Sequence, residues 1–332
     1  MRRSVILLLC VLAGFLFASC KREPLYDRES GVYLKTNVIL GPSTVLTGNV
    51  DIDGDPVLSA KVNGKMPDRL RVLFYDVNTH EYVTEEFLPP QGGFVNVPAG
   101  TYDILVYGLG TEVTRVSGSE TRAGTYAVTS YVGTKVKVRT KAGPGIEGQT
   151  EFPVIYEPDH VFVGRASNVV VPVRSELDDT IVIEMDLSTL LDTYTLEVLN
   201  VFNAEAIQSM TVYITGHAPS RYLWDKRFPK SPSAIMFEAM PDVEDGCIRT
   251  AFNTFGKFPE ESNEVFLNVQ ITDVEGGRFQ WVYDVTDQFD NPDNTGHRIV
   301  ITDVMEIPDG GTGGFAPDVN DWDPVIEVVP MY

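Results

Sequence analysis

The chain has 332 residues, of which 43% are hydrophobic and 22% charged, and its 26 Lys and Arg against 47 Asp and Glu give a net charge of −21. The apolar fraction is sufficient for a globular core, and at roughly 100–200 residues per domain the length predicts two domains. The excess of acid argues against nucleic acid or an anionic membrane surface as partner, because basic residues must neutralise the phosphates of both. With 3 Cys, the chain cannot be a disulfide-rich scaffold.

The first nineteen residues predict an export signal. Arg2 and Arg3 precede an apolar run from Val5 to Phe17, which is shorter than the ~20 residues of a membrane-spanning helix. Small residues then stand directly before Cys20, a pattern that resembles the bacterial lipobox, although Phe17 occupies the position where Leu is usual. The resemblance implies acylation of Cys20, palmitate included, and an outer-membrane lipoprotein at the cell surface. An ordinary signal with an incidental Cys20 is the alternative.

Residues 20–30 are polar and indicate a tether, and short strand-like segments rich in Val, Ile, Tyr, Phe and Thr follow it. In Thr134–Thr140 the alternation directs Val136 and Val138 to one side and the basic residues to solvent. The predicted strands are Arg69–Asp76, Gly93–Val97, Thr101–Tyr107, Tyr126–Val132, Thr134–Thr140, Asn168–Val173, Thr180–Asp186, Tyr194–Val201, Met210–Thr215, Ile248–Thr254, Glu264–Thr272, Phe279–Val285 and His297–Thr302.

Many short strands with few helices favour an all-β fold of two antiparallel β-sandwiches. Helical turns are expected only at Ser188–Leu191 and Asn203–Ser209. A polar break predicts an N-terminal domain over 31–175 and a C-terminal domain over 176–309. Residues 310–332 form a Gly-rich linker followed by a C-terminal strand.

No familiar catalytic motif is present in the sequence. His80-Glu81 begins a metalloprotease pattern that Thr84 breaks, and the other histidines have no partner at metal-ligand spacing. The lone mature thiol, Cys247, is expected in the core. We therefore predict no enzyme and no cofactor, although carboxylates paired in space could form a hydrolase that one sequence does not reveal.

Three carboxylates on alternate residues, Asp51, Asp53 and Asp55, are the weak calcium candidates. An EF-hand counted from Asp51 requires Glu at position 62, which is Val62, so that motif is excluded. Because acids are so abundant in this chain, such a cluster also arises by chance.

Two aromatic residues between prolines, Tyr222 and Trp224, are candidates for an exposed glycan platform. A second aromatic set lies on one face of a predicted strand at Phe279, Trp281 and Tyr283, where packing in the core is the commoner outcome.

The segment 95–107 predicts a hairpin, in which Pro98 fixes φ, Gly100 supplies a positive φ and Tyr102 points inward. With Arg71–Asp76 it resembles the first domain of fimbrillin-type lipoproteins from Bacteroidales. Further blocks resemble a Bacteroidales lipoprotein family of unknown function that is related to fimbrial anchor and tip subunits. These blocks are Phe252–Gly256, Tyr283–Gln288, Glu306–Pro308 and Gly313–Trp322, with Cys20 and Arg22–Leu25.

The resemblance implies transthyretin- or immunoglobulin-like sandwiches, lipid anchoring and no known catalysis. It predicts a structural or adhesive surface subunit, with other fimbrial subunits as partners. Residues Val325, Ile326, Val328 and Val329 are the candidate donor strand for assembly by β-strand addition, or they pair within their own domain. A glycan-binding surface lipoprotein is the alternative function. Asp179-Thr180-Ile181 resembles an O-glycosylation acceptor, with Thr180 as the modified residue.

Overall fold

Strands dominate the computed structural model, which describes residues 30–141, 147–172, 181–259, 264–308 and 325–330. The all-β expectation is confirmed. In chain order the first strands are β1 (Gly31–Val38), β2 (Arg69–Asp76), β3 (Tyr82–Leu88), β4 (Gly92–Asn96), β5 (Gly100–Leu109), β6 (Thr114–Ser117), β7 (Tyr126–Thr129), β8 (Tyr131–Lys141), β9 (Glu147–Tyr156), β10 (Phe162–Val171) and β11 (Ile181–Thr189).

The later strands supply most of the second part of the molecule. They are β12 (Asp192–Val198), β13 (Val201–Phe202), β14 (Ile207–His217), β15 (Ser220–Tyr222), β16 (Ser233–Ala239), β17 (Pro241–Asp242), β18 (Cys247–Thr254), β19 (Phe266–Asp273), β20 (Arg278–Asp284), β21 (Arg298–Ile301), β22 (Met305–Glu306) and β23 (Val325–Pro330).

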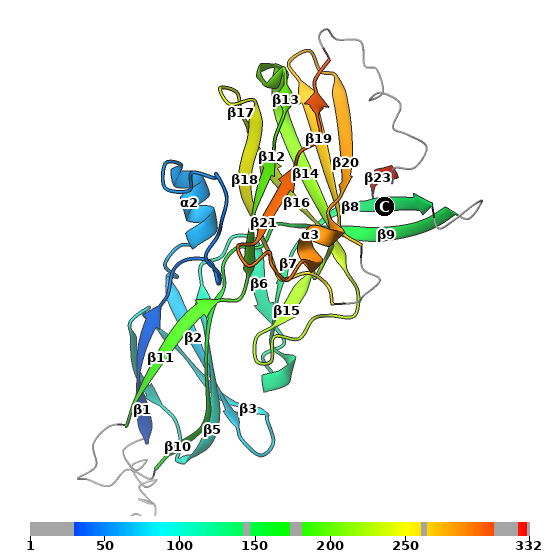
Figure 1. Cartoon of the computed structure of the whole chain (residues 1–332). Helices are drawn as coiled ribbons and strands as arrows, with labels where there is room; N and C mark the ends of the chain where they lie inside the picture. Colours follow the sequence, from blue (N-terminus) through cyan, green and yellow to red (C-terminus); the bar gives the residue numbers. More distant parts are fainter. Residues whose placement is uncertain (1–29, 142–146, 173–180, 260–263, 309–324, 331–332) are drawn as a thin grey trace, which may run out of the picture.

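The N-terminal sheet has the order β3-β2-β5-β10-β11-β1-β4 and folds over on itself (Figure 1). Only two residue pairs join β10 to β11, so the sheet bends there into two layers. Alternate side chains from both layers meet in one core, which includes Leu34, Val72, Phe74, Ile104 and Leu187. Burying such side chains stabilises the fold by about 1.5–3 kcal/mol each.

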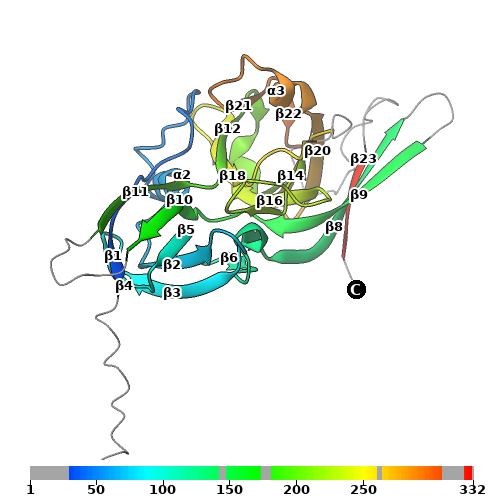
Figure 2. The same ribbon diagram turned by 90° about the horizontal axis from the view of Figure 1, so that it is seen from below.

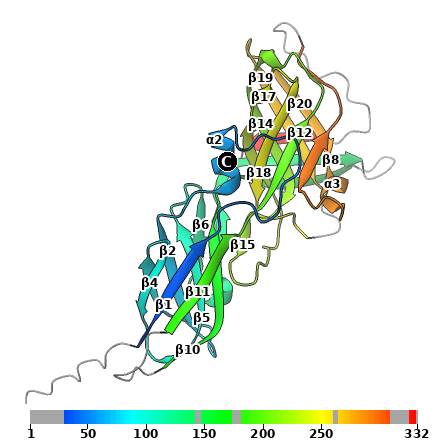
Figure 3. The same cartoon turned by 60° about the vertical axis from the view of Figure 1, so that its left-hand side comes forward.

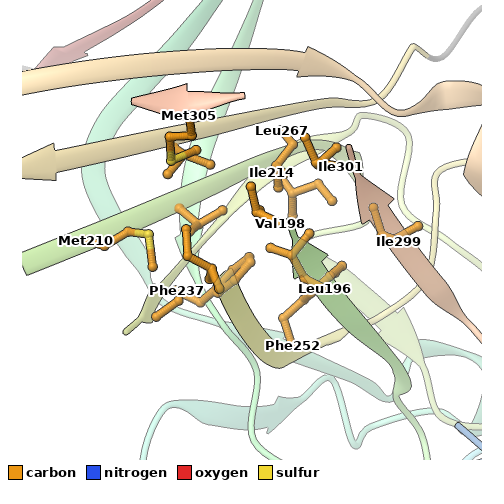
Figure 4. Close-up of a cluster of buried hydrophobic side chains, with 14 of the residues drawn as sticks. Leu196, Val198, Met210, Ile214, Phe237, Phe252, Leu267, Ile299, Ile301 and Met305 are labelled. Carbon is orange, nitrogen blue, oxygen red and sulfur yellow. The ribbon is translucent and has the colours of Figure 1, made fainter. Parts of the chain in front are cut away.

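The N-terminal sheet and its core form the first of two bodies. In the second body, a sheet ordered β20-β19-β14-β16-β9-β8-β23 packs against one ordered β17-β18-β12-β21. Their facing side chains form the largest core (Figure 4), with Leu196, Ile214, Phe237, Phe252 and Leu267 among them. The predicted inward face of β20 is confirmed, because Phe279 is buried and Trp281 and Tyr283 pack against this core. Cys247 is buried, as expected.

Strand pairing crosses the domain boundary predicted at residue 175. β9 precedes that boundary but pairs in parallel with β16, and β11 follows it but pairs in parallel with β1. β12–β21 and β13–β22 are parallel as well, so the sheets are mixed rather than purely antiparallel. Parallel neighbours require long connections, and those that join β1 to β11 and β9 to β16 include strands of the other body. The division into domains stays a prediction.

The helices differ from those expected. Ser188–Leu191 is not helical, and its first two residues are the last two of β11. Asn203–Ser209 contains only the 3-10 turn η2 (Ala204–Ala206), after which β14 begins. A helix that the sequence reading missed, α2 (Pro56–Asn63), has Asp55 as N-cap, accepting hydrogen bonds from the backbone amides of Val57 and Leu58. The remaining short helices are α3 (Thr286–Asp290) and η1 (Arg122–Gly124).

The segment 95–107 confirms one expectation and corrects two others. It is not a hairpin, because β4 pairs with β1 while β5 pairs with β2 and β10, so the turn between them joins strands that are not neighbours in the sheet. Tyr102 is buried and its hydroxyl donates to the carbonyl of Pro98 at 3.0 Å. Gly100 does not have the positive φ expected of it; Gly92 does, at 90°. A Cβ at Gly92 would lie 2.0 Å from the Leu34 carbonyl oxygen, so the close approach of β4 to β1 requires glycine there.

Candidate functional site

The last strand, β23, closes the outer edge of β8. It runs antiparallel to β8 with Val325 opposite Arg139, Val328 opposite Val136 and Pro330 opposite Thr134. All four candidate donor-strand residues therefore lie within a regular ladder with the same chain. Without β23, the backbone of 134–139 would present an unpaired edge, the kind of template that binds another strand.

A hydrophobic cluster lies under this edge. Val136 and Val138 of β8 and Phe152 and Val154 of β9 are buried together with Tyr213, Ala234 and Phe266 from strands β14, β16 and β19 of the same sheet. The alternation predicted for β8 is confirmed, because Val136 and Val138 are buried while Lys135 and Lys137 on the other face are only partly covered and pair with Glu151. The β8–β9 hairpin projects from the body (Figure 2), and β23 pairs with residues 134–139 of β8.

The connection to β23 is long. β22 ends at Glu306 and β23 begins at Val325. Fully extended, residues 307–324 could span about 60 Å, at 3.3–3.6 Å per residue. That length permits β23 to pair either with its own β8 or with the β8 of a neighbouring molecule.

The candidate glycan platform is not exposed as predicted, because both aromatic residues are partly buried. The guanidinium of Arg227 lies 4.2 Å from the ring centre of Tyr222, which also packs against Tyr126. Arg122 lies 4.6 Å from the ring centre of Trp224 and forms an ion pair with Asp103. Each ring thus has a cation over one face, and glycan binding there stays a prediction.

The three calcium candidates lie on the segment that leads into α2. Asp51 accepts a hydrogen bond from the amide of Gly54, and Asp55 caps α2. Within the described residues, ligand atoms converge instead at Asp242, Asp245 and Cys247, and Arg249 pairs with both of these carboxylates. An acidic cluster neutralised by arginine is a structural feature rather than a cation site.

A buried polar network between the two bodies was missed by the sequence reading. Lys61 of α2 pairs with Glu157 at 2.8 Å, and Glu157 also accepts from the amide of Asn253. The Lys61 carbonyl accepts from the Asn253 amide group and from Nε2 of His160. Burial raises the pKa of Glu157 and lowers that of His160. No spacing in the sequence links these residues, since the fold alone assembles them.

A shallow cavity of about 430 Å³ lies beside α3 and is lined by polar residues. Its amide side chains are already bound within the protein: Gln288 bonds to the backbone of Val300, and Asn294 to that of Gln288 and Arg298. Arg298 in turn pairs with buried Glu197. Internal hydrogen bonds of the surrounding turn therefore already use the amide side chains that line the cavity, which leaves few of its polar groups for a ligand.

Two candidate modification sites, Cys20 and Thr180, lie outside the described residues. Within the part of the chain that the structure describes, no helix has the length and apolar character needed to cross a membrane.

These sheets define an all-β chain whose last strand closes an exposed hairpin edge. The chain belongs to the family described as a domain of unknown function, DUF5119, whose pattern matches residues 44–238. It is 30% identical over 102 residues to a candidate fimbrium anchoring subunit, Fim4B, from Bacteroides ovatus. That alignment covers 31% of this chain and 27% of the relative, so the chain spans about a quarter of that relative's length.

A solved structure shares the fold. A candidate adhesin from Bacteroides ovatus aligns over 89% of this chain and 98% of its own, with 21% identity and a TM-score of 0.59. The fimbrial anchor protein Mfa2 from Porphyromonas gingivalis aligns more loosely over 81% and 90%, with 14% identity and a TM-score of 0.45. The predicted relationship to Bacteroidales fimbrial and adhesin proteins is thus confirmed.

Proposed function

We propose that the chain is a fimbrillin-like structural or adhesive subunit, tethered to the outer membrane through acylated Cys20 and exposed at the cell surface. The similarity to a candidate fimbrium anchoring subunit supports the fimbrial role. The lipobox-like segment supports the anchor, which intact-mass measurement of the mature protein tests directly. In this proposal the protein has no catalytic function, and its partners are other fimbrial subunits.

The observation that carries the assembly mechanism is the β8–β23 ladder. Its six residue pairs bind through the backbone, so the same ladder forms equally well with a β23 from another molecule. The buried side chains of Val136 and Val138 fix the face of β8 that must point inward. The long 307–324 connection allows exchange without unfolding the body.

Removal of residues 310–332 from the mature, acylated chain in detergent tests this mechanism. We expect the truncated chain to keep its β-sheet circular dichroism, lose self-association or capture of a partner subunit, and bind a synthetic peptide of residues 324–332. Val328→Pro is a second variant with full length, since proline removes one amide donor and disrupts the ladder. Unchanged oligomerisation in both folded variants would refute strand exchange.

A further inference from the structure

Three apolar side chains form one exposed row across the outer face of β4, β1 and β11. Tyr33 lies opposite Phe94 on one side and Val182 on the other. Their side chains are 43%, 39% and 56% exposed, whereas Val32 and Leu34, which flank Tyr33 on β1, are fully buried. The row therefore belongs to the outer face of a well-packed sheet and is not part of a loosened core.

The next row on the same face has a different character. Lys35 pairs with Glu184 at 2.7 Å, and Asn37 donates to Asp186. Polar pairs thus cover this face farther along β1, and the apolar row is confined to the end where β1 begins. Val170 of β10, paired with Thr101 near the β4–β5 turn, is 63% exposed at the same end.

This end is where the chain enters the fold. β1 starts at Gly31, and β1, β10 and β11 all reach the end of the molecule that lies opposite the β19–β20 turn (Figures 1 and 3). The eleven residues 20–30 can extend at most about 40 Å. A lipid on Cys20 therefore keeps the start of β1, beside the apolar row, within about that distance of the bilayer.

The chemistry of the row fits a membrane–water interface. Tyr and other amphipathic or aromatic side chains favour the headgroup level, where an apolar ring is partly desolvated and a hydroxyl stays hydrated. The tether sequence 21–29 has three basic and three acidic residues and is neutral, unlike the strongly acidic chain as a whole. An acidic protein is repelled by anionic lipids, but contact through apolar side chains does not require them. Such contact is therefore compatible with the net charge of −21.

We infer that the row Tyr33–Phe94–Val182 rests on the membrane surface and orients the tethered body, with the β8–β9 hairpin directed away from the bilayer. The inference rests on the proposed acylation of Cys20. It assigns the row to a lipid headgroup layer and not to a second protein.

The test uses the mature acylated chain in phosphatidylcholine vesicles. An environment-sensitive dye is attached at Val182→Cys in a Cys247→Ser background, and its quenching by doxyl-labelled lipid is measured. The matched control carries the dye at Val274→Cys, which is 63% exposed in the turn after β19 at the opposite end. We expect at least several-fold stronger lipid quenching at 182 than at 274, and loss of that difference in a Tyr33→Ser/Phe94→Ser variant.

Vesicle flotation separates the two proposals. Flotation with equal, weak quenching at both positions overturns the orienting contact and leaves the anchor in place. Failure to float overturns the anchor, and the inference with it. A dye response at 182 that follows protein concentration instead of doxyl lipid assigns the row to a second copy and likewise overturns the inference.

Discussion

Val328 of the last strand lies directly opposite Val136 of β8, and the Val136 side chain is completely buried. The strand whose edge β23 occupies, β8, thus also contributes Val136 and Val138 to a hydrophobic cluster. A strand that leaves this edge loses its backbone pairing with β8, so replacement of β23 by another strand is favoured over an unpaired edge.

The cluster beneath the edge is expected to support the fold. Val136→Ala removes two buried methyl groups and should lower the free energy of unfolding by about 2 kcal/mol. Lys137→Ala, on the solvent side of the same strand, should change it by less than about 0.5 kcal/mol. Urea denaturation followed by circular dichroism measures both, and equal effects would show that β8 does not pack as described.

Trp224 is expected to contribute mainly to the stability of the fold. Its ring packs against the cluster that contains Leu105, Leu191 and Leu223, under the guanidinium of Arg122. We expect Trp224→Ala to cost about 2–3 kcal/mol of unfolding free energy. Tyr131→Ala, at an aromatic residue that is largely exposed, should have little effect. A Trp224→Ala protein of unchanged stability that loses binding on a glycan array would instead favour the glycan platform.

The Lys61–Glu157 pair should stabilise the contact between the two bodies. Lys61→Met leaves the buried Glu157 carboxylate without its cation, at an expected cost of about 2–4 kcal/mol near neutral pH. Burial already raises the pKa of Glu157, and loss of Lys61 raises it further, so the carboxyl takes up a proton as pH falls. The cost should therefore shrink at pH 5. Lys61→Arg keeps the charge, and an equal loss in both variants would assign the effect to packing.

His217 should make the fold sensitive to acid. Complete burial lowers its pKa to about 4, while its Nδ1 donates to the carbonyl of Thr215 at 2.9 Å. Between pH 6.5, the ordinary pKa of histidine, and pH 4, His217 is protonated in the unfolded chain but neutral in the native protein. The free energy of unfolding therefore falls as pH falls. The expected loss by pH 4 is about 3 kcal/mol.

His217→Gln retains a hydrogen-bond donor and should remove that part of the pH dependence. The remaining slope would include His160, whose pKa burial also lowers. Unfolding free energies measured at pH 7, 5.5 and 4 provide the comparison. Parallel curves for the two proteins would show that His217 does not carry the effect.

Local patterns in the sequence predicted much of the β-structure, because alternation reports directly which side of a strand is buried. β2 was predicted with its observed bounds, and the faces of β8 and β20 were correct. The helix α2 was recognisable from Asp55, Pro56 and Gly64, an N-cap, a first-turn proline and a terminal glycine, but its weak apolar periodicity concealed it.

What the sequence could not provide was pairing between distant segments. Nothing local indicates that β9 joins β16, that β11 joins β1, or that Lys61 meets Glu157, since these contacts are set by the packing of whole sheets. The same limit applies to Tyr222 and Trp224, whose prolines suggested an exposed loop while arginines from elsewhere in space cover the rings.

Exchange of β23 between molecules is tested most directly by a mixed disulfide. Lys135 of β8 lies opposite Val329 of β23 and its side chain is exposed, so Lys135→Cys in one chain and Val329→Cys in a second chain of different mass place one thiol on each side of the ladder. Co-expression followed by mild oxidation should yield a disulfide-linked heterodimer, identified by mass spectrometry. A crosslink that forms only when both cysteines are in the same chain would contradict assembly through this strand.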